Sequence, residues 1–337
     1  MAFVFNGETF YVNLRYMAIR LVTYEHSEAL PHLSGKNVFH SVSLFRILER
    51  TPGFSPFMLV AFDGDRPIGK LLCVVRKSWF VKRCIIYDTG EYFDTDIKHD
   101  LIFDELLSYL TNRNKDNFSI IEFRNLSESL FGYRYFRQNG YFPIRRLRVI
   151  NSIHHATIDK WMEASRKRQI QSGLRNGAEM GVADTKEQVK AFFRMLKKYY
   201  SSKVFKYFPA MDFFTTLAEQ GRGSDEIGKI FTVSYCGKII GGSCCLFSDE
   251  TVYMLFSGGM RKSYPSLYPG VLAVWKAMLY SREKGYSHFE FIDAGLPFKK
   301  YGYRDFILRF GGKQLSTRRW YRLKWGWLNR ILEKIYV

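Results

Sequence analysis

The spacing of apolar positions changes along the chain and outlines short strands and helices. Residues 58–75 and 231–247 each read as an apolar strand, a turn containing glycine and a second apolar strand, which predicts two β-hairpins. Residues 84–90 and 252–258 are short apolar runs ending in glycine, and each predicts one further strand.

Each of those strands leads through a polar loop into a segment with helical spacing. Residues 101–113 and 271–284 predict helices, and Gly285 is placed to cap the second one. Residues 119–125 and 288–295 predict strands that follow the helices. The order strand, strand, strand, loop, helix, strand therefore occurs twice.

The two copies align at nearly constant shifts, which indicates an internal duplication. The hairpins match at a shift of 173, with the pairs Val60/Val233, Phe62/Tyr235, Gly64/Gly237 and Gly69/Gly242. The later strands match at a shift of 168, with the pairs Glu122/Glu290 and Asn125/Asp293. Helical spacing at 186–200 and 211–220 precedes the second hairpin. Chance similarity of hairpins is the alternative, but it does not explain five elements in one order.

These elements predict an α/β (α+β) fold made of two tandem units, residues 1–152 and 153–337. Each unit is expected to be a mixed, mostly antiparallel sheet flanked by helices. Apolar residues make up 47% of the chain and aromatic residues 17%, which excludes a disordered protein.

The charge is unevenly distributed. The chain carries 51 Lys and Arg against 32 Asp and Glu, a net charge of +19, and 31 of those basic residues lie in 151–337. The last 41 residues hold 11 basic and 2 acidic side chains. This asymmetry favours a polyanionic partner such as nucleic acid, anionic lipid or a phosphate-rich small molecule; a solubilising surface is the alternative.

Several classes of site and location are disfavoured. The five cysteines form no CxxC pair, and the seven histidines do not cluster with cysteines or carboxylates, so we expect no metal. No apolar stretch has the length of a membrane span, and Met1–Gly7 does not resemble a secretory signal. We expect a cytoplasmic protein, with peripheral contact to the inner face of the plasma membrane left open.

Three segments carry a family resemblance. Residues 166–182 (RKRQIQSGLRNGAEMGV), 289–295 (FEFIDAG) and 303–312 (YRDFILRFGG) resemble the basic helix, the strand ending in Asp and Gly, and the closing FKxxFGG segment of the Fem family. Those proteins are aminoacyltransferases that build peptidoglycan interpeptide bridges. The element order resembles the GNAT acyltransferase fold, so the resemblance covers most of the chain and implies tandem GNAT-like units.

The sequence departs from the family at two places. Ile307 stands at the family's lysine position, and Lys299 and Lys300 lie slightly earlier instead. The GNAT loop R/QxxGxG/A is replaced by the stretch from Gly258 to Pro265. The resemblance implies that such Fem-like proteins need not use acetyl-CoA.

The loop between the strand at 252–258 and the following helix is the candidate donor site. Backbone N–H groups and the positive end of a helix dipole suit phosphate there, although many strand–helix loops are basic without binding one. The candidate donor-binding residues are Gly258, Gly259, Arg261, Lys262, Ser263, Tyr264 and Gly270.

Cations interleaved with aromatic residues mark the candidate catalytic segment, where an oxyanion or a diphosphate would be stabilised. The same pattern is typical of a solvated strand. The candidate catalytic residues are Lys299, Lys300, Arg304, Arg309 and Asp293, the last to orient an amine or to cap a turn. The candidate substrate-binding residues are Tyr301, Tyr303, Arg168 and Arg175; the two arginines would share one helix face, which solvent could equally cover.

Residues 318–337 predict a basic amphipathic helix with five aromatic side chains. Such a helix is typical of an anionic membrane surface, and docking of a terminal helix on the core is the alternative.

The first hypothesis is an envelope-related N-acyltransferase that moves an acyl or aminoacyl group to an amine on a peptidoglycan precursor, surface polysaccharide or lipid-linked acceptor. No cofactor would be bound permanently; acyl-CoA or aminoacyl-tRNA would be the donor substrate. The second hypothesis is an acyl-CoA-dependent transferase acting on a sugar or amino lipid. The third is a non-catalytic RNA- or membrane-binding module. We expect the second unit to hold the reaction centre, because it carries most of the charge.

Overall fold

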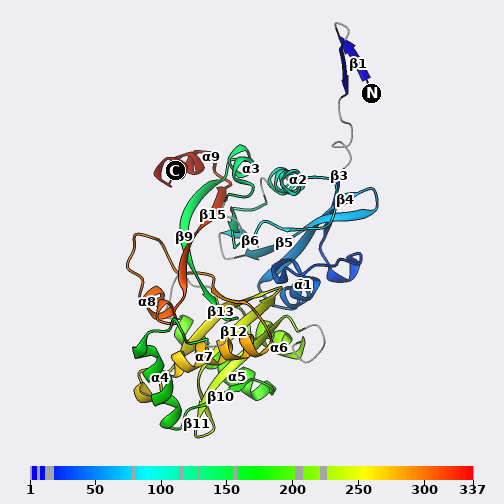
Figure 1. Cartoon of the computed structure of the whole chain (residues 1–337). Coiled ribbons are helices and arrows are strands. Elements are labelled where there is room, and N and C mark those ends of the chain that lie inside the picture. The colour runs from blue at the N-terminus through cyan, green and yellow to red at the C-terminus, as the bar shows by residue number, and fades with distance from the viewer. Residues whose placement is uncertain are drawn as a thin grey trace.

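The computed structural model describes residues 2–5, 8–11, 19–77, 81–113, 117–126, 130–154, 158–201, 208–220 and 226–336 (Figure 1). The first half contains β1 (Ala2–Phe5), β2 (Glu8–Tyr11), β3 (Ile19–Tyr24), α1 (Val42–Glu49), β4 (Phe54–Asp63), β5 (Arg66–Lys77), β6 (Lys82–Tyr87), β7 (Glu91–Tyr92), α2 (His99–Arg113), β8 (Ile120–Arg124), α3 (Tyr133–Gln138) and β9 (Phe142–Ser152). The second half contains α4 (Ala164–Arg175), β10 (Glu179–Val182), α5 (Lys186–Ser201), α6 (Met211–Gln220), β11 (Gly228–Tyr235), β12 (Lys238–Ser248), β13 (Thr251–Gly259), α7 (Pro269–Glu283), β14 (His288–Phe291), α8 (Gly302–Leu308), β15 (Lys313–Leu323) and α9 (Gly326–Tyr336). Short 3-10 turns lie at Ser27–Ala29, Val38–His40 and Pro265–Leu267.

One large sheet runs through both halves. Its strand order is β10-β11-β12-β13-β14-β9-β15-β8-β6-β5-β4-β3, with β7 beside β5, while β1 and β2 form a separate pair. Neighbouring strands are antiparallel except for β13–β14 and β6–β8, which are parallel. The sheet is therefore mixed and mostly antiparallel, which confirms the predicted fold class.

The strand order is symmetric about the central pair β9–β15, and the two units exchange their last strands. Strand β9 of the first half pairs with β14, and β15 of the second half pairs with β8. The two exchanged strands then pair with each other from Lys313↔Ile150 to Tyr321↔Phe142. The boundary between the units at 152/153 stays a prediction. Each half of the sheet includes one strand from the other unit, β9 in the second half-sheet and β15 in the first.

The predicted repeat of elements is confirmed in both units. The two hairpins are β4–β5 and β11–β12, and the two helices of the repeat are α2 and α7. Gly285 follows α7 with a φ of 83°, a left-handed conformation that glycine adopts without strain, so it ends the helix as expected.

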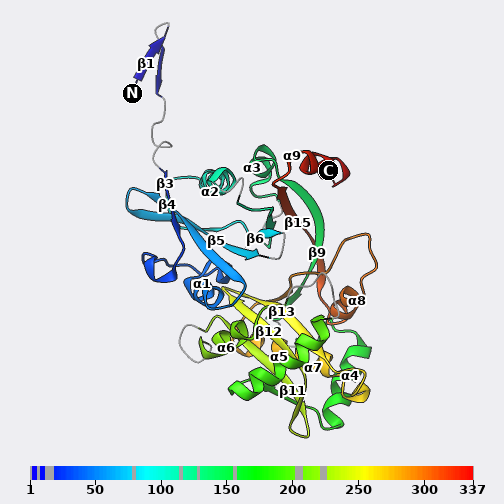
Figure 2. The same cartoon turned by 180° about the vertical axis from the view of Figure 1, so that it is seen from behind.

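Helices cover both faces of the sheet (Figures 1 and 2). They enclose three apolar cores. In the second unit α7 packs on one face, while α5 and α6 pack on the other. In the first unit α2 covers one face and α1 the other. Helix α1 also contacts α6, so one core contains residues of both units and joins them.

The predicted helix at 318–337 is corrected by the structure, because residues up to Leu323 belong to β15 and α9 begins at Gly326. Trp320 is fully buried and its ring stacks on Phe136 at 4.6 Å. Trp320 is buried because β15 pairs with both β8 and β9. The apolar spacing within residues 318–337 gives no information about these distant strands.

Candidate functional site

A cavity of about 540 Å³ lies where β13 ends and α7 begins, and we call it the loop cavity. Its walls come from the end of β13, the first turn of α7, and side chains of α4, α5 and α8. The lining residues are Arg166, Gln169, Tyr199, Ser257, Gly258, Gly259, Arg261, Tyr268, Pro269, Gly270, Val271, Tyr301, Gly302, Tyr303, Asp305, Phe306 and Arg309.

Glycines bring the strand and the helix together at the loop cavity. A Cβ on Gly259 would lie 2.4 Å from the backbone nitrogen of Gly270, so no larger residue fits at this crossing. The residue before α7, Tyr268, has a φ of 46° and provides no side-chain cap. The positive end of the α7 dipole therefore points to a cavity wall without a capping side chain from Tyr268.

Three arginines make the loop cavity strongly cationic. Arg166 is buried, its guanidinium lies 4.6 Å from the ring centres of Phe306 and Phe310, and it donates a hydrogen bond to the carbonyl of Phe306 at 2.7 Å. Burial and the neighbouring charges of Arg309 and Arg261 lower the pKa of Arg166 to about 10. Cations held this close together are stabilised by a polyanion.

A second cavity of about 280 Å³ lies between the two units, and we call it the junction cavity. Most of its wall is apolar and comes from α1, β5, α6, β12 and β13, whereas its charged residues are four arginines and one aspartate. The lining residues are Phe39, Leu44, Leu48, Phe54, Leu72, Val74, Arg76, Arg83, Ile85, Tyr87, Arg124, Tyr200, Pro209, Phe213, Leu246, Met254, Leu255, Phe256, Ile292, Asp293, Tyr303 and Arg319.

A buried glutamate holds the arginines of the junction cavity. The Glu122 carboxylate lies 2.6 Å from Arg83, 2.9 Å from Arg124 and 3.7 Å from Arg319, and it accepts a hydrogen bond from the Tyr321 hydroxyl at 3.2 Å. Burial alone would raise the pKa of Glu122, but the three guanidinium groups lower it to about 2. One carboxylate faces three cations, so this end of the cavity keeps a positive excess.

Asp293 and Tyr303 both line the junction cavity. The Asp293 carboxylate lies 3.3 Å from Arg319 and accepts the backbone N–H of Gly295 at 3.1 Å, so it does cap a turn. Tyr303 lines both cavities, and its hydroxyl hydrogen-bonds to Ser257. Burial, with Tyr200 nearby, raises the pKa of Tyr303 well above its usual value, so its hydroxyl stays protonated at neutral pH.

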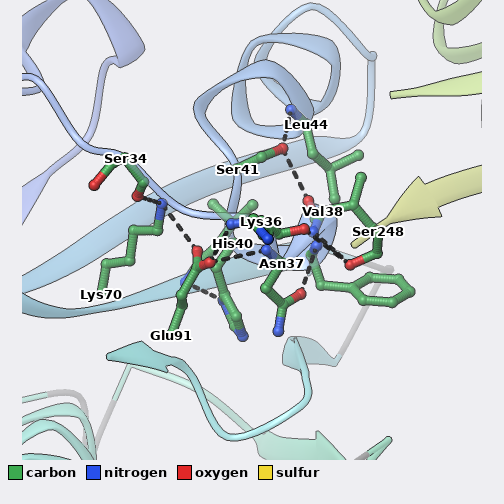
Figure 3. A network of polar contacts seen from close by, with 12 residues as sticks. Ser34, Lys36, Asn37, Val38, His40, Ser41, Leu44, Lys70, Glu91 and Ser248 are labelled. Carbon is green, nitrogen blue, oxygen red and sulfur yellow. Dashed lines mark hydrogen bonds and ion pairs between the residues drawn. The ribbon is translucent and has the colours of Figure 1, made fainter. Parts of the chain in front are cut away.

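A polar network fixes the wall that α1 contributes to the junction cavity (Figure 3). The Lys70 ammonium lies 3.0 Å from the Glu91 carboxylate, which also accepts the backbone N–H of Asn37 at 2.8 Å. The Ser248 hydroxyl of β12 accepts the backbone N–H of Val38 at 3.0 Å and so connects this segment to the second unit. Burial, with the charge of Lys70, lowers the pKa of His40 to about 3, and the neutral ring accepts the N–H of Leu72.

The structure brings seven of the predicted site residues to the loop cavity, namely Gly258, Gly259, Arg261, Gly270, Tyr301, Tyr303 and Arg309. Asp293 lies at the junction cavity instead. Their roles in binding or catalysis stay predictions.

The other predicted residues line neither cavity. Lys299, Lys300, Lys262 and Ser263 are exposed or partly exposed, and Tyr264 packs on Tyr235. Arg304 donates to the carbonyls of Ala294, Leu296 and Lys299, so its guanidinium holds the preceding loop in shape. Arg168 and Arg175 lie on the exposed side of α4.

Sequence reasoning assigned no role to the inward arginine of α4. Arg166 shares a buried face with Ile170 and Gly173, at i, i+4 and i+7 spacing. An arginine on the apolar stripe of a basic helix was the available signal. The four arginines of the junction cavity were also missed, because three of them come from the first unit and the fourth from an exchanged strand.

The first unit has a counterpart of the loop cavity, a hollow of about 480 Å³ at the start of α2. It is lined by Thr95, Asp96, Ile97, Lys98, His99, Asp100 and Phe131. We call it the counterpart cavity. Its described lining contains two carboxylates and no arginine. Among the residues that the structure describes, no three His, Cys, Asp or Glu side chains are grouped to hold a metal ion.

Comparisons with known proteins agree with this geometry. Residues 164–300 match the family model for the acetyltransferase (GNAT) domain, and the matched range contains β13, its loop and α7. A comparison with the curated proteins gives no match.

Solved structures share the fold over nearly the whole chain. FemX is 12% identical with a TM-score of 0.61, covering 92% of this chain and 96% of its own. The C-terminal domain of a putative lysylphosphatidylglycerol synthetase from Agrobacterium fabrum is 12% identical with a TM-score of 0.56, covering 88% and 91%. A tandem GNAT protein from the clavulanic acid biosynthesis pathway is 10% identical with a TM-score of 0.55, covering 91% and 99%. The fold is therefore a tandem GNAT fold similar to that of FemX, and the domain match supports an acyltransferase.

Proposed function

We propose that this chain is an N-acyltransferase that moves an acyl or aminoacyl group from an activated donor to an amine of a cell-envelope precursor. The observation that carries the proposal is the pair of cavities that meet at Tyr303, one cationic and one mostly apolar with arginines. Two substrates need two adjoining sites, and no cofactor has to stay bound between turnovers.

The loop cavity suits the donor. Arg166, Arg261 and Arg309 together with the start of α7 offer charge and N–H groups to a diphosphate or to the phosphates of a tRNA end. The match of residues 164–300 to an acetyltransferase domain favours acyl-CoA over aminoacyl-tRNA as the donor.

The junction cavity suits the acceptor. Its apolar wall and its four arginines fit a molecule with an apolar part and an acidic group, such as a lipid-linked precursor. FemX and the domain of the putative lysylphosphatidylglycerol synthetase share the fold, and the second protein is named for a phospholipid that carries a lysyl group. That shared fold is the reason for placing the acceptor in the cell envelope.

The proposed reaction needs no covalent intermediate on the protein. The acceptor amine attacks the donor carbonyl carbon, the new C–N bond forms, and the carbonyl oxygen becomes an oxyanion. The oxyanion then collapses and the bond to the leaving group breaks. The Tyr303 hydroxyl, kept protonated by burial, gives its proton to the leaving group, and the proton lost by the amine passes through water to Tyr303.

Charge stabilisation falls to residues that line the cavities. Arg309 lines the loop cavity and would stabilise the oxyanion. The sequence had suggested this role for Lys299 and Lys300 together with Arg309. Asp293, at the junction cavity, would orient the acceptor ammonium, which releases one proton to solvent water and becomes the attacking amine.

The test is calorimetric binding of acetyl-CoA, a longer acyl-CoA and charged tRNA, each measured separately at two salt concentrations. We expect acyl-CoA binding to weaken about tenfold in Arg261→Gln and in Arg309→Gln, because each loses a charge-assisted hydrogen bond to phosphate. Arg282→Gln at the far end of α7 is the matched control and should bind like the wild type.

Three outcomes would count against this assignment. A loss of donor binding in Arg168→Gln with none in Arg261→Gln would move the donor site to the exposed side of α4. Preference for charged over uncharged tRNA, with no CoA signal, would change the donor. Failure of every donor to bind would remove the catalytic assignment and leave a non-catalytic binding module.

A second candidate keeps the fold and the loop cavity but places a free sugar or an amino lipid in the acceptor site. The acetyltransferase domain match favours this alternative for the acyl-CoA donor. Turnover of acetyl-CoA with amino sugars, but not with amine-bearing envelope precursors, would select it.

A further inference from the structure

The outward face of α9 combines apolar and basic side chains. Trp327, Ile331 and Ile335 follow one another at four-residue intervals and are 62%, 48% and 66% exposed. Arg330 and Lys334 lie between them and are also exposed. The face is therefore a single stripe in which cations alternate with large apolar groups.

The opposite face fixes α9 to the sheet. Asn329 is buried, its side-chain amide donates to the carbonyl of Gly140 at 2.9 Å, and its oxygen accepts the N–H of Leu323 at 3.0 Å. The Tyr336 ring stacks on Phe142 of β9. The helix is thus held by its inner face, and its apolar stripe stays exposed on the folded chain.

Helix α3 lies beside α9. The guanidinium of Arg137 in α3 binds Glu333 of α9 at 2.5 Å, and the two helices lie side by side at one end of the molecule in both views (Figures 1 and 2). Leu130 and Tyr133, next to and in α3, are 62% and 36% exposed. Because Arg137 neutralises the carboxylate of α9, Arg330 and Lys334 dominate the charge of the surface.

We propose that the surface formed by α3 and α9 docks on an anionic lipid bilayer, with Trp327, Ile331 and Ile335 entering the headgroup layer. None of the described helices has the length and apolarity needed to cross a bilayer. An exposed amphipathic face of this kind places α9 parallel to the membrane plane. Arg330 and Lys334 face the same way as the apolar groups and meet lipid phosphates while their stems stay among the headgroups.

The chemistry of the stripe selects a bilayer over other occupants. A dry protein interface excludes charge from its centre, whereas here cations alternate with the apolar groups. A nucleic-acid platform needs aromatic rings for base stacking, and two of the three central apolar residues are isoleucines.

The experiment is flotation of the full chain with phosphatidylcholine vesicles, with and without phosphatidylglycerol, together with tryptophan emission. We expect binding to the anionic vesicles alone, weakened by salt. Ile331→Ser and Ile335→Ser should each weaken it about tenfold, and Arg330→Gln with Lys334→Gln about tenfold together. Trp327→Phe should keep binding but lose most of the blue shift in emission.

Matched variants elsewhere keep the test specific. Leu174→Ser on α4 is the control for the isoleucine variants, because it removes a similarly exposed apolar side chain. Trp161→Phe is the control for Trp327→Phe, because the two tryptophans are similarly exposed. Lys190→Gln with Lys197→Gln removes two positive charges from α5 and is the control for the charge variant of α9. These control variants should bind vesicles like the wild type.

Equal vesicle binding by Ile331→Ser and the wild type would overturn the proposal. It would also be overturned if the wild type dimerised with rising concentration in the absence of vesicles and Ile331→Ser did not. Donor binding in solution is expected to be unchanged in the α9 variants, so this test is independent of the proposed activity.

Discussion

The two units share one order of elements but differ in charge at equivalent buried positions. Glu122 on β8 and Glu290 on β14 are both buried, and each faces an arginine from the strand that the other unit contributes, Arg319 and Arg148. Glu122 has two further arginines, and its pKa falls to about 2. At Glu290 burial outweighs the pairing with Arg148, and the pKa rises to about 7.

A contrast of the opposite sense occurs at the start of the repeated helix, where the second unit has the arginines. The loop cavity has three arginines and Asp305, whereas the counterpart cavity has two aspartates with Lys98 and His99. Both contrasts arise on one backbone topology. The duplication therefore preserves strand pairing, and the side-chain charges decide which unit can receive a polyanion.

The largest effect is expected from neutralising Glu122. Glu122→Gln leaves three guanidinium groups without their shared carboxylate, and we expect a loss of about 3–5 kcal/mol in the free energy of unfolding at pH 7. Glu290→Gln should cost much less, because the charged form of Glu290 is already disfavoured there. Urea unfolding of both variants measures the difference, and equal losses would contradict the electrostatic contrast.

A second prediction uses Lys70, which stands at the position of Ser243 when the hairpins are aligned at a shift of 173. Lys70→Ser removes the ammonium from a buried pair with Glu91, so we expect a loss of about 3 kcal/mol in the free energy of unfolding. Ser243→Ala, which removes a buried hydrogen bond to the Ala273 carbonyl, should cost about 1 kcal/mol. Similar losses in the two variants would show that the Lys70–Glu91 pair adds nothing to the first unit.

How far the sequence predicts this molecule depends on whether a feature is local. Hairpins, repeated helices and Gly285 follow from spacing within short windows, and the structure confirms them. Exchange of β9 and β15 depends on pairing between residues more than 130 positions apart, which no window contains. The error at 318–323 has the same origin, since Trp320 is buried by strands far away in the chain.

The candidate site was predictable in its backbone and less so in its side chains. The strand–loop–helix with Gly258, Gly259 and Gly270 was found, because glycine and helix signals are local. Arg166 was not singled out, because its contacts with the rings of Phe306 and Phe310 join α4 to a segment about 140 positions away. The hydrogen bonds of Arg304 could not be predicted, because its partners are backbone carbonyls, which leave no mark in a sequence.

A third prediction concerns pH. Glu290 has a folded-state pKa raised from 4.5 to about 7, so the unfolded chain releases this proton first as the pH rises. The stability of the wild type relative to Glu290→Gln should therefore fall by about 3 kcal/mol as the pH rises from 4.5 through about 7, and then level off.

Glu122 provides the control for that window. Its folded-state pKa is depressed to about 2, so its contribution is fully present above pH 4.5 and is lost as the pH falls toward 2. The stability difference between the wild type and Glu122→Gln should stay constant between pH 4.5 and 7. A constant difference for Glu290→Gln over the same range would show that Glu290 is not perturbed.

The smallest effect is expected at the counterpart cavity. Asp96 is exposed there, and Asp96→Arg gives the first unit one of the cations that the loop cavity has. We still expect calorimetry to find one donor bound per chain, with the affinity changed less than about twofold, because distant exposed charges are screened. A second reason is steric: Gly259 lets α7 approach the end of β13 at the loop cavity, where a Cβ would lie 2.4 Å from the backbone nitrogen of Gly270. Two donors per chain in Asp96→Arg would mean that charge alone separates the units.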